Sequence, residues 1–252
     1  MKTMRLSRFF IDEALSPGQS LILPPHLVNY IVNVLRLKKG ADIILFNGQA
    51  IDKQSGEFTA TLTEISKRSS AALIEKFIVK NIESPINSHL FQGISRSERM
   101  DYTIQKAVEL GITAITPVFT QRSNLRKLND KQLQKKRLHW QGIATSACEQ
   151  SGRTTLVKIM PPVQVKQIGE FKADLNLLLS PTAQSNISDL QSIQANSINI
   201  FIGPEGGLSS EEINCAVNQD FQEIKLGKRV LRTETAGLAI LSILQFLWGD
   251  LG

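Results

Sequence analysis

A glycine-rich loop is the part of this sequence whose residue types most clearly predict ligand binding. It reads Gly203-Pro204-Glu205-Gly206-Gly207 and directly follows the apolar segment Ile198–Ile202. Three glycines at the carboxyl end of a strand allow backbone conformations closed to other residues and let a ligand approach the main chain. The loop is neither a phosphate-binding P-loop nor the Gly-x-Gly-x-x-Gly dinucleotide fingerprint. It therefore predicts a pocket for another ligand, with a plain tight turn as the alternative.

A second loop, residues 226–236, combines charged, hydroxyl and apolar side chains about twenty residues later. Its sequence is Leu-Gly-Lys-Arg-Val-Leu-Arg-Thr-Glu-Thr-Ala. Taken alone, this segment could be only a charged helix start. Like the glycine-rich loop, this segment follows a predicted strand, and it joins that strand to the terminal helix.

Most of the excess positive charge lies in one segment. The chain has 29 Lys and Arg against 23 Asp and Glu, a net charge of +6. Between Arg122 and Arg137 there are seven basic residues and one acid, so the remainder is balanced. A local basic segment on an otherwise neutral protein is typical of proteins that bind a polyphosphate such as RNA. A solvated helix face would give the same pattern.

Composition limits the classes of protein to which this chain can belong. The 252 residues are 42% hydrophobic and 21% charged, as in a globular chain that forms two domains. Cys148 and Cys215 are far apart and the three histidines are not clustered, so neither a disulfide framework nor a metal site is expected. Met1–Phe10 lacks the apolar region of a signal peptide, and Ala236–Trp248 is too short to span a membrane. We expect a cytoplasmic protein.

Two kinds of pattern divide the chain near residue 75. The first part alternates short β segments with turn signals and one short helix, which predicts a small β-barrel. From about Phe77, apolar strands alternate with helices, which predicts an α/β domain with a mostly parallel sheet. The N-terminal elements are expected at Arg5–Ile11, Ser20–Leu23, Pro25–Leu37, Ile43–Phe46 and Phe58–Leu62. The later strands are expected at His89–Ile94, Ala114–Val118, Leu175–Leu179, Ile198–Ile202 and Glu223–Leu226.

Start signals place the helices between these strands. Ser or Thr followed three residues later by Glu is the capping-box pattern. In the helix that ends near Gln150, Lys131, Lys135 and Lys136 are expected on the solvent side, and Ile143, Ala144 and Ala147 on the core side. The expected helix starts are Ser95 with Glu98, Asp130, Ser209 with Glu212, and Thr233 or Thr235.

The two loops together resemble the RsmE family of 16S ribosomal RNA (uracil-N3)-methyltransferases, members of the SPOUT superfamily. They spell Gly-Pro-Glu-Gly-Gly-Leu-Ser and Leu-Gly-x-x-Val-Leu-Arg-Thr-Glu-Thr-Ala, a highly specific pair. The likeness covers nearly the whole chain, although Lys158 stands where a proline is expected and Ala50–Ser55 looks like an insertion. Further matching segments are Arg99–Asp101, Gln105–Gly111, Pro117, Gln121–Ser123, Trp140, Ala144, Ala147–Arg153 and Pro161–Pro162.

The resemblance implies a fold and a cofactor. Residues 1–75 would form a PUA-like β-barrel that binds RNA, and residues 76–252 a SPOUT-type α/β domain whose mostly parallel sheet ends in a trefoil knot. The loops of the knot would bind S-adenosyl-L-methionine. The implied cofactor-binding residues are Leu178, Leu179, Ser180, Ile202, Gly203, Pro204, Glu205, Gly206, Gly207, Leu226, Gly227, Val230, Leu231, Arg232, Thr233, Thr235 and Ala236.

The implied reaction places a methyl group on N3 of a specific uridine in 16S ribosomal RNA. N3 carries a proton at neutral pH, so the site must favour loss of that proton or stabilise the anion. Arg122, Arg153 and Arg232 are candidates for contact with the base or a phosphate. Glu149 and Glu234 are candidates for accepting the proton or orienting an arginine. Each of these residues could instead form a surface ion pair.

Partners follow from the same resemblance. The implied partners are 16S ribosomal RNA or the small ribosomal subunit and a second copy of the chain, packed through Ala236–Trp248, with neither a metal nor a membrane. The RNA-binding candidates are Arg5, Arg8, Arg36, Arg122, Lys131, Lys135, Lys136 and Arg153. Two other classes stay open: a related enzyme that methylates a ribose hydroxyl, and an RNA-binding assembly protein without a cofactor. Nucleoside mass spectrometry would identify the enzyme that methylates a ribose, and calorimetry with the cofactor would identify the assembly protein, which binds none.

Overall fold

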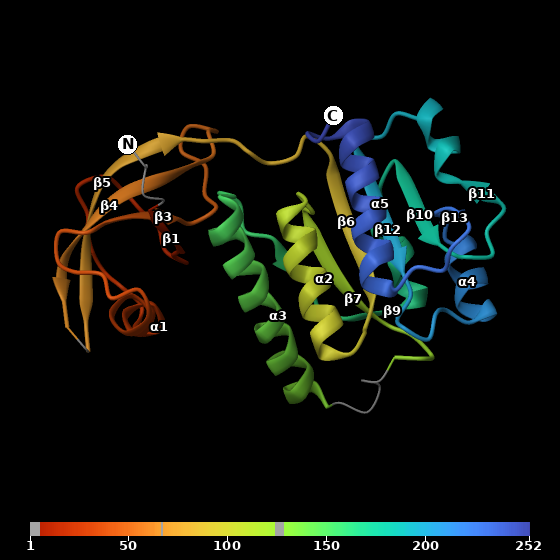
Figure 1. The fold of residues 1–252 in the computed structure, drawn as a ribbon, viewed down its shortest axis with the longest axis horizontal. Coiled ribbons are helices and arrows are strands. Elements are labelled where there is room, and N and C mark those ends of the chain that lie inside the picture. Colours follow the sequence, from red (N-terminus) through yellow and green to blue (C-terminus); the bar gives the residue numbers. More distant parts are fainter. Residues whose placement is uncertain (1–5, 67, 124–128) are drawn as a thin grey trace. The chain divides into compact units, whose positions relative to one another are not determined.

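The chain divides into two compact units. The computed structural model describes residues 6–66, 68–123 and 129–252. One unit contains the residues up to Glu83 together with Cys148–Leu156, and the other contains Ser84–Ala147 and Val157–Gly252. Figure 1 shows a β-rich N-terminal part and an α/β part formed by the rest of the chain.

The N-terminal unit is built on a five-stranded sheet with strand order β1-β3-β4-β5-β2. β1 runs parallel to β3, and the other paired strands are antiparallel. Along β4, the side chains of Phe58, Ala60 and Leu62 alternate into the core, as expected of a half-buried strand. The strands are β1 (Ser7–Phe10), β2 (Ser20–Ile22), β3 (Asp42–Phe46), β4 (Gly56–Ile65) and β5 (Ser70–Val79).

The helix expected at Pro25–Leu37 is shorter than predicted and changes from an α-helix to a π-helix. α1 covers Pro25–Asn29, with its proline at the first helical position, and the chain continues as a π-helix over Tyr30–Val34. Ile31 is fully buried in the core of this unit. In the segment expected to be an insertion, Ile51 pairs with Gln54 across Asp52 and Lys53, which both have positive φ. This is the geometry of a two-residue type I′ hairpin turn.

The C-terminal unit is built on an eight-stranded sheet in which every paired strand is parallel, as predicted. The strand order is β11-β13-β10-β12-β6-β7-β8, and β9 also pairs with β7. The strands are β6 (Asn87–Gly93), β7 (Ala114–Phe119), β8 (Lys158–Ile159), β9 (Val163–Gln164), β10 (Leu175–Leu179), β11 (Ser185–Asn186), β12 (Ser197–Ile202) and β13 (Gln222–Lys225).

Helices cover this sheet because its central strands are apolar on both faces. α2 and α5 pack against each other in front of β6 and β12 (Figure 1), and α4 packs on the 3-10 helix Val165–Glu170. On α3, Ala144 and Ala147 are buried while Lys131 and Lys135 are exposed, as predicted. The helices are α2 (Ser97–Glu109), α3 (Asp130–Ser151), α4 (Ser210–Val217) and α5 (Thr233–Trp248).

Helices α3 and α5 begin at Asp130 and Thr233, close to where they were expected, but only one of the four expected helix caps is confirmed. Ser209 and Glu212 form a complete capping box at α4. Ser95 instead donates its hydroxyl proton to the carbonyl of Gly93, and α2 begins two residues later. At α3 the residue that bonds back to the first turn is Asn129, not Asp130. α5 follows Arg232 without a side-chain cap, and neither Thr233 nor Thr235 has that role.

Candidate functional site

A cavity of about 640 Å³ opens at the carboxyl ends of three neighbouring strands in the C-terminal unit. β10, β12 and β13 lie side by side in the sheet, so the loops that follow them meet at one edge. The glycine-rich loop after β12 and the 226–236 loop after β13 both line the cavity, so the two loops that the family resemblance joins in one site do lie together. The lining includes Leu179–Thr182, Ile202–Leu208, Ile224–Gly227, Arg229–Thr233 and Ala236.

Fifteen of the seventeen residues proposed as cofactor-binding line this cavity. The two that do not are Leu178 and Thr235. Leu178 is buried in the core with Phe91 and Val118, because consecutive residues of a strand point to opposite faces of a sheet. Thr235 is exposed, one position from Ala236 on α5. Residues of both loops singled out in the sequence thus line the cavity, whereas Leu178 and Thr235 are not among its lining residues.

Other lining residues were missed from the sequence. Pro181 and Thr182 extend the β10 loop, and Ile213 reaches the cavity from α4. Arg99 comes from α2, more than a hundred residues before the loops that it faces. The strand-end rule could have found Pro181 and Thr182, because they directly follow a predicted strand. Arg99 carried no local signal for this pocket.

Hydrogen bonds join the two pocket loops to the end of β6. Gln92, fully buried, donates from Nε2 to the hydroxyl oxygen of Thr233 over 3.0 Å. Thr233 in turn donates to the carbonyl oxygen of Gly203 over 2.6 Å. The threonine expected to cap α5 therefore connects α5, β6 and the glycine-rich loop. This network fixes the wall of the cavity before any ligand arrives.

Two glycines in the site have specific roles. Gly93, at the end of β6, lies so close to Pro204 that a Cβ atom would come within 2.6 Å of the Pro204 nitrogen. Gly207 has φ +72°, a left-handed conformation that favours glycine, and its N–H donates to the carbonyl of Pro204 in a tight turn. The loop therefore depends on one glycine for close packing and on another for its backbone shape.

Arg122 lies over the glycine-rich loop. Its Nη1 donates to the carbonyl oxygens of Gly206 over 2.6 Å and of Leu208 over 3.4 Å. A Cβ atom on Gly206 would lie 3.0 Å from the Cβ of Arg122. The glycine-rich loop and Arg122 therefore hold each other in place, and part of the arginine's donor capacity is used within the protein.

A cation and two carboxylates meet beside the cavity. Nη1 of Arg99 is 3.8 Å from Oε1 of Glu205, and its Nε is 4.0 Å from Oε1 of Glu234. Glu205 also accepts the backbone N–H of Arg96 over 2.8 Å. Arg232 lines the cavity and is exposed. Of the proposed catalytic residues, Arg122, Arg232 and Glu234 thus lie in or beside the cavity region.

Glu149 and Arg153 belong to the N-terminal unit and are not among the residues that line the cavity. Glu149 accepts the backbone N–H of Phe10 over 3.0 Å; burial raises its pKa, while the Phe10 amide and the charge of Arg8 oppose the rise. Arg153 is buried and donates from Nε to Glu83 over 2.8 Å. Both residues therefore have structural contacts within their own unit, and their catalytic roles stay predictions.

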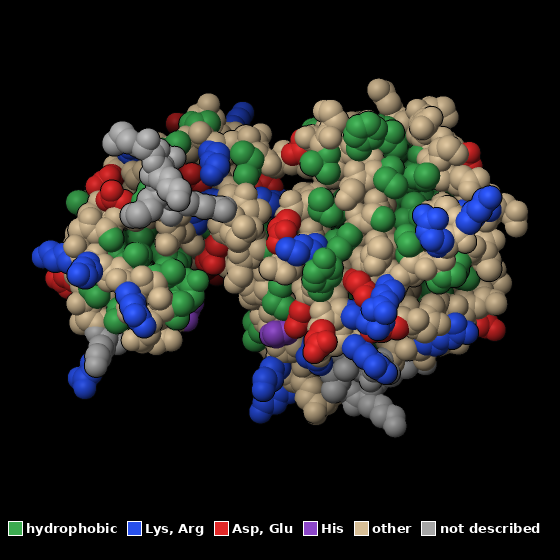
Figure 2. Space-filling view, in the orientation of Figure 1, with side chains coloured by type: hydrophobic (Ala, Val, Ile, Leu, Met, Phe, Trp, Pro, Cys, Tyr) green, Lys and Arg blue, Asp and Glu red, His purple; other side chains and the backbone are tan. Residues whose placement is uncertain are grey.

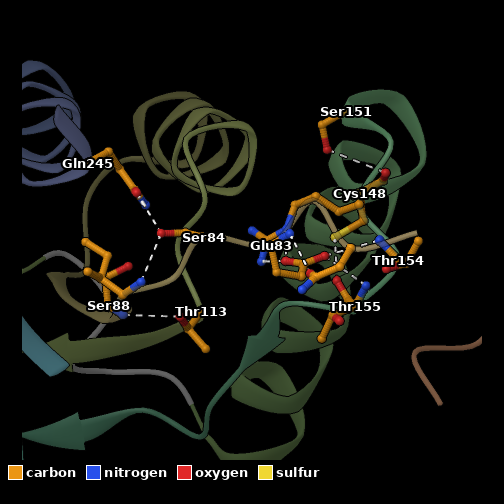
Figure 3. A network of polar contacts seen from close by, with 12 residues as sticks. Glu83, Ser84, Ser88, Thr113, Cys148, Ser151, Thr154, Thr155 and Gln245 are labelled. Atoms are coloured by element: carbon orange, nitrogen blue, oxygen red, sulfur yellow. Dashed lines mark hydrogen bonds and ion pairs between the residues drawn. The ribbon is translucent and has the colours of Figure 1, made fainter. Parts of the chain in front are cut away.

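Figure 3 shows the contacts of Glu83 and Ser84, two consecutive residues. Glu83 accepts the backbone N–H groups of Thr154 and Thr155 in addition to Arg153. Ser84 donates to Oε1 of Gln245 over 2.7 Å, which ties the start of the C-terminal unit to its last helix. These contacts explain how buried polar groups are satisfied on each side of the unit boundary.

The RNA-binding candidates differ in exposure. Arg8 has a side chain only 6% exposed, paired with Glu57 at 2.9 Å and lying over the ring of Phe46. Arg153 is likewise buried, so neither has the exposed side chain expected of a phosphate contact. Arg36 and Arg122 are exposed, and Arg5 lies outside the described residues. Lys131 and Lys135 are exposed and Lys136 is half-buried; we call these three the lysine face of α3.

Figure 2 shows Lys and Arg side chains distributed over the visible face of the C-terminal unit, with acidic side chains between them. Within the ranges 6–66, 68–123 and 129–252, no cluster of three or more His, Cys, Asp or Glu could hold a metal ion. The same residues include no helix that is both long and apolar enough to cross a membrane. Both cysteines are free.

Comparisons with known proteins match both units. Residues 82–245 match a family model described as an RNA methyltransferase domain, and residues 23–75 match an RNA methyltransferase PUA domain. The chain is 36% identical to ribosomal RNA small subunit methyltransferase E of Buchnera aphidicola, over 98% of both chains. It is 30% identical to the protein of the same name from Bacillus subtilis, over 96% of both chains.

Solved structures with a similar fold are also methyltransferases, as these relatives are. A methyltransferase from Legionella pneumophila in complex with bound SAM has a TM-score of 0.92 and 38% identity, over 98% of this chain and all of that one. Ribosomal RNA small subunit methyltransferase E from Neisseria gonorrhoeae, bound to S-adenosyl methionine, has a TM-score of 0.87 and 38% identity at the same coverage. On sequence and fold together, this chain belongs to the family of ribosomal RNA small subunit methyltransferase E.

Proposed function

We propose that this protein is an S-adenosyl-L-methionine-dependent methyltransferase that methylates N3 of a specific uridine in 16S ribosomal RNA. The observation that carries the proposal is the cavity at the ends of β10, β12 and β13, lined by the two loops that resemble the family's cofactor loops. Two relatives at 38% identity were solved with this cofactor bound.

The residues of the cavity fit such a cofactor. Its volume lies within the range of about 300–1,000 Å³ common for small-molecule sites. Leu226, Val230 and Leu231 offer apolar walls, and Val230 is 81% exposed, so its side chain is open to contact with a bound molecule. Around Gly227 a Cβ atom would meet nothing within 4 Å, so its backbone is open to a ligand. The glycine loops would hold the adenosyl part through main-chain groups.

The cofactor, when bound, supplies a methyl group attached to a positively charged sulfur. The protein must then bring uracil N3 in line with that methyl group and favour loss of the N3 proton, which is mainly a task of positioning. Arg122 holds the glycine-rich loop, Arg232 offers an exposed guanidinium at the cavity, and Glu234 faces Arg99 beside it. We keep Arg122, Arg232 and Glu234 as candidates for base contact and arginine orientation.

The decisive experiment is nucleoside mass spectrometry of small-subunit ribosomal RNA from cells that lack the protein. Loss of 3-methyluridine, restored by the wild-type gene, supports the proposal. Loss of a ribose-methylated nucleoside with unmodified uracil would instead identify the related sugar-methylating activity. Calorimetry of the purified protein with S-adenosyl-L-methionine tests the cofactor independently, and an RNA-binding assembly protein would show no binding.

We further propose that residues 1–75 form a PUA-like β-barrel and that residues 76–252 contain a trefoil knot. The matched family models at 23–75 and 82–245 support this division, and the convergence of three loops from parallel strands suits a knotted cofactor site. RNA would contact the lysine face of α3, Arg36 and Arg122, all at least partly exposed. A cytoplasmic location follows from a ribosomal substrate.

We also propose a homodimer that packs through α5. Ile240, Leu241 and Leu244 face the core of their own unit, whereas Phe246 on another side of the helix is 64% exposed. Figure 2 shows hydrophobic side chains gathered on the surface over α5. An apolar patch of this kind on a globular protein suits an interface between subunits.

A further inference from the structure

Arg99 lines the cavity, as Arg122 and Arg232 do, and it also lies close to two carboxylates. It lies in the first turn of α2, lines the cavity, and has a side chain 34% exposed. Its guanidinium makes no hydrogen bond to any described residue, because its two carboxylate neighbours lie 3.8 and 4.0 Å away. The N–H donors of the Arg99 guanidinium are thus not used in hydrogen bonds to the described residues, and the residue itself lines the cavity.

Two carboxylates nonetheless fix the position of this guanidinium. Glu205 belongs to the glycine-rich loop and is held by the backbone N–H of Arg96. Glu234 belongs to the first turn of α5 and has a side chain only 15% exposed. Its Oε2 atom is buried and accepts no hydrogen bond within the described part of the chain. The arginine is thus held by charge from both sides, without using its donors.

This arrangement suits a residue that binds a developing negative charge. Arginine stays protonated under all ordinary conditions and offers several donors in one plane. Arg122, by contrast, donates to the carbonyls of Gly206 and Leu208. The two carboxylates lie 3.8 and 4.0 Å from the Arg99 guanidinium, so its donors are not held in hydrogen bonds to them.

We propose that Arg99 is a catalytic residue that donates hydrogen bonds to a carbonyl oxygen of the target uracil and stabilises the N3 anion, with Glu205 and Glu234 as its positioning residues. The inference rests on the proposed function. In the step, the N3–H bond breaks and the proton passes to a base in the solvent. The N3 electron pair then forms the bond to the methyl carbon, while the bond from that carbon to sulfur breaks and its electron pair stays on sulfur.

The test compares Arg99→Gln and Arg99→Lys with Arg96→Gln as a matched control. Arg96→Gln removes the same charge from the same end of α2, but Arg96 is exposed and does not line the cavity, and its backbone bond to Glu205 remains. The substrates are small subunits reconstituted with 16S ribosomal RNA that contains either uridine or 5-fluorouridine. Fluorine at C5 withdraws electrons and makes the N3 proton more acidic, so it replaces part of what a stabilising cation does.

We expect Arg99→Gln to lower kcat on uridine by roughly 100-fold, the usual loss when one donor to a developing charge is removed. The deficit should shrink on 5-fluorouridine and as the pH rises, because the anion then forms with less help. Arg99→Lys keeps the charge but loses the planar set of donors, so its deficit should be smaller and respond in the same way. Arg96→Gln should behave like the wild type, and calorimetry should show unchanged cofactor binding in all three variants.

Three results would overturn the inference. If the Arg99→Gln deficit is the same for both substrates at every pH, the residue does not act on the N3 anion. If that variant loses cofactor affinity but keeps kcat at saturation, Arg99 binds the cofactor instead. If the wild type makes no 3-methyluridine, the proposed function fails and the inference fails with it. Should Arg99→Gln not fold, as judged by thermal melting, the response of Arg99→Lys to 5-fluorouridine decides the question.

Discussion

Replacing Gly93 by alanine should disturb the proposed cofactor pocket through packing alone. The backbone of Gly93 has an ordinary negative φ range, so an alanine adds no conformational strain. Its Cβ would lie 2.6 Å from the nitrogen and 2.7 Å from Cδ of Pro204, whereas ordinary contact begins near 3.4 Å. The end of β6 and the glycine-rich loop must therefore separate by about 0.8 Å, in an interior packed too densely to absorb the shift freely.

The expected effects are a loss of stability and a larger loss of activity. Overpacking of this kind lowers the free energy of unfolding by about 1–3 kcal/mol. A misplacement approaching 1 Å in a positioned site lowers kcat/KM by up to about 100-fold. Unfolding is measured by urea titration with tryptophan fluorescence, cofactor affinity by calorimetry, and kcat/KM with small subunits as substrate.

Gly237→Ala is the matched control, since it adds the same methyl group on the other side of Gln92. Here the new Cβ would meet Gln92 Oε1 and Ile202 Cγ1 at 3.8 Å, an ordinary contact. Alanine is also the better residue within α5, so the unfolding free energy should rise by about 0.5–1 kcal/mol with activity retained. If Gly93→Ala is as stable and active as the wild type, or if both variants lose equally, the packing argument is wrong.

Three further predictions concern RNA, pH and assembly. Changing the lysine face of α3 to glutamine should weaken RNA binding and lower the log–log salt slope by roughly 0.7–0.9 for each lost phosphate contact; an unchanged slope would mean a merely solvated face. Burial lowers the pKa of His89 from 6.5 to about 4. Between these two pH values the unfolded chain binds a proton that the native protein lacks. The unfolding free energy should therefore fall by at most about 3 kcal/mol as the pH drops from 6.5 to about 4. Urea titrations of wild type and His89→Gln check this, and an equal pH dependence in both would refute it. Arg122 contacts the glycine-rich loop of its own chain, so mixing Arg122→Ala with Gly206→Val protein should leave activity at the parental level once subunit exchange is shown; restored partial activity would mean that the site is shared between the two chains of a homodimer.

Local signals in the sequence were sufficient to find the pocket loops. The glycines at 203–207 and the capping box of Ser209 and Glu212 act over a few residues, and parallel strands bring their ends to one edge whatever the rest of the chain does. The same reasoning failed where a distant group competed. Thr233 has the residue type of a helix cap, but the carbonyl of Gly203, thirty residues earlier, takes its hydroxyl proton.

Two other failures have a similar cause. β5, at Ser70–Val79, was not predicted, and its pairing with β4 contains two register shifts. Such irregularities change which side chains face inward and so blur the period of two on which strand prediction depends. Arg99 was noted only within a segment that resembles the family pattern, because its two carboxylate partners lie more than a hundred residues away in sequence. Only the assembled fold brings the three charges together.

The central position of β6 and β12 also determines how the protein reaches its native state. Asn87 pairs with Ser197 and the register continues to Gln92 and Ile202, so the middle of the sheet forms between segments that are remote in sequence. Contacts of this kind require the closure of a long loop before they contribute stability, which slows folding. Until β12 arrives, the apolar edge of β6 lacks a partner on that side and can pair with another chain. The protein should therefore refold slowly and aggregate at high concentration, and chaperones that shield exposed strands should raise its yield more than that of a helical protein of the same size.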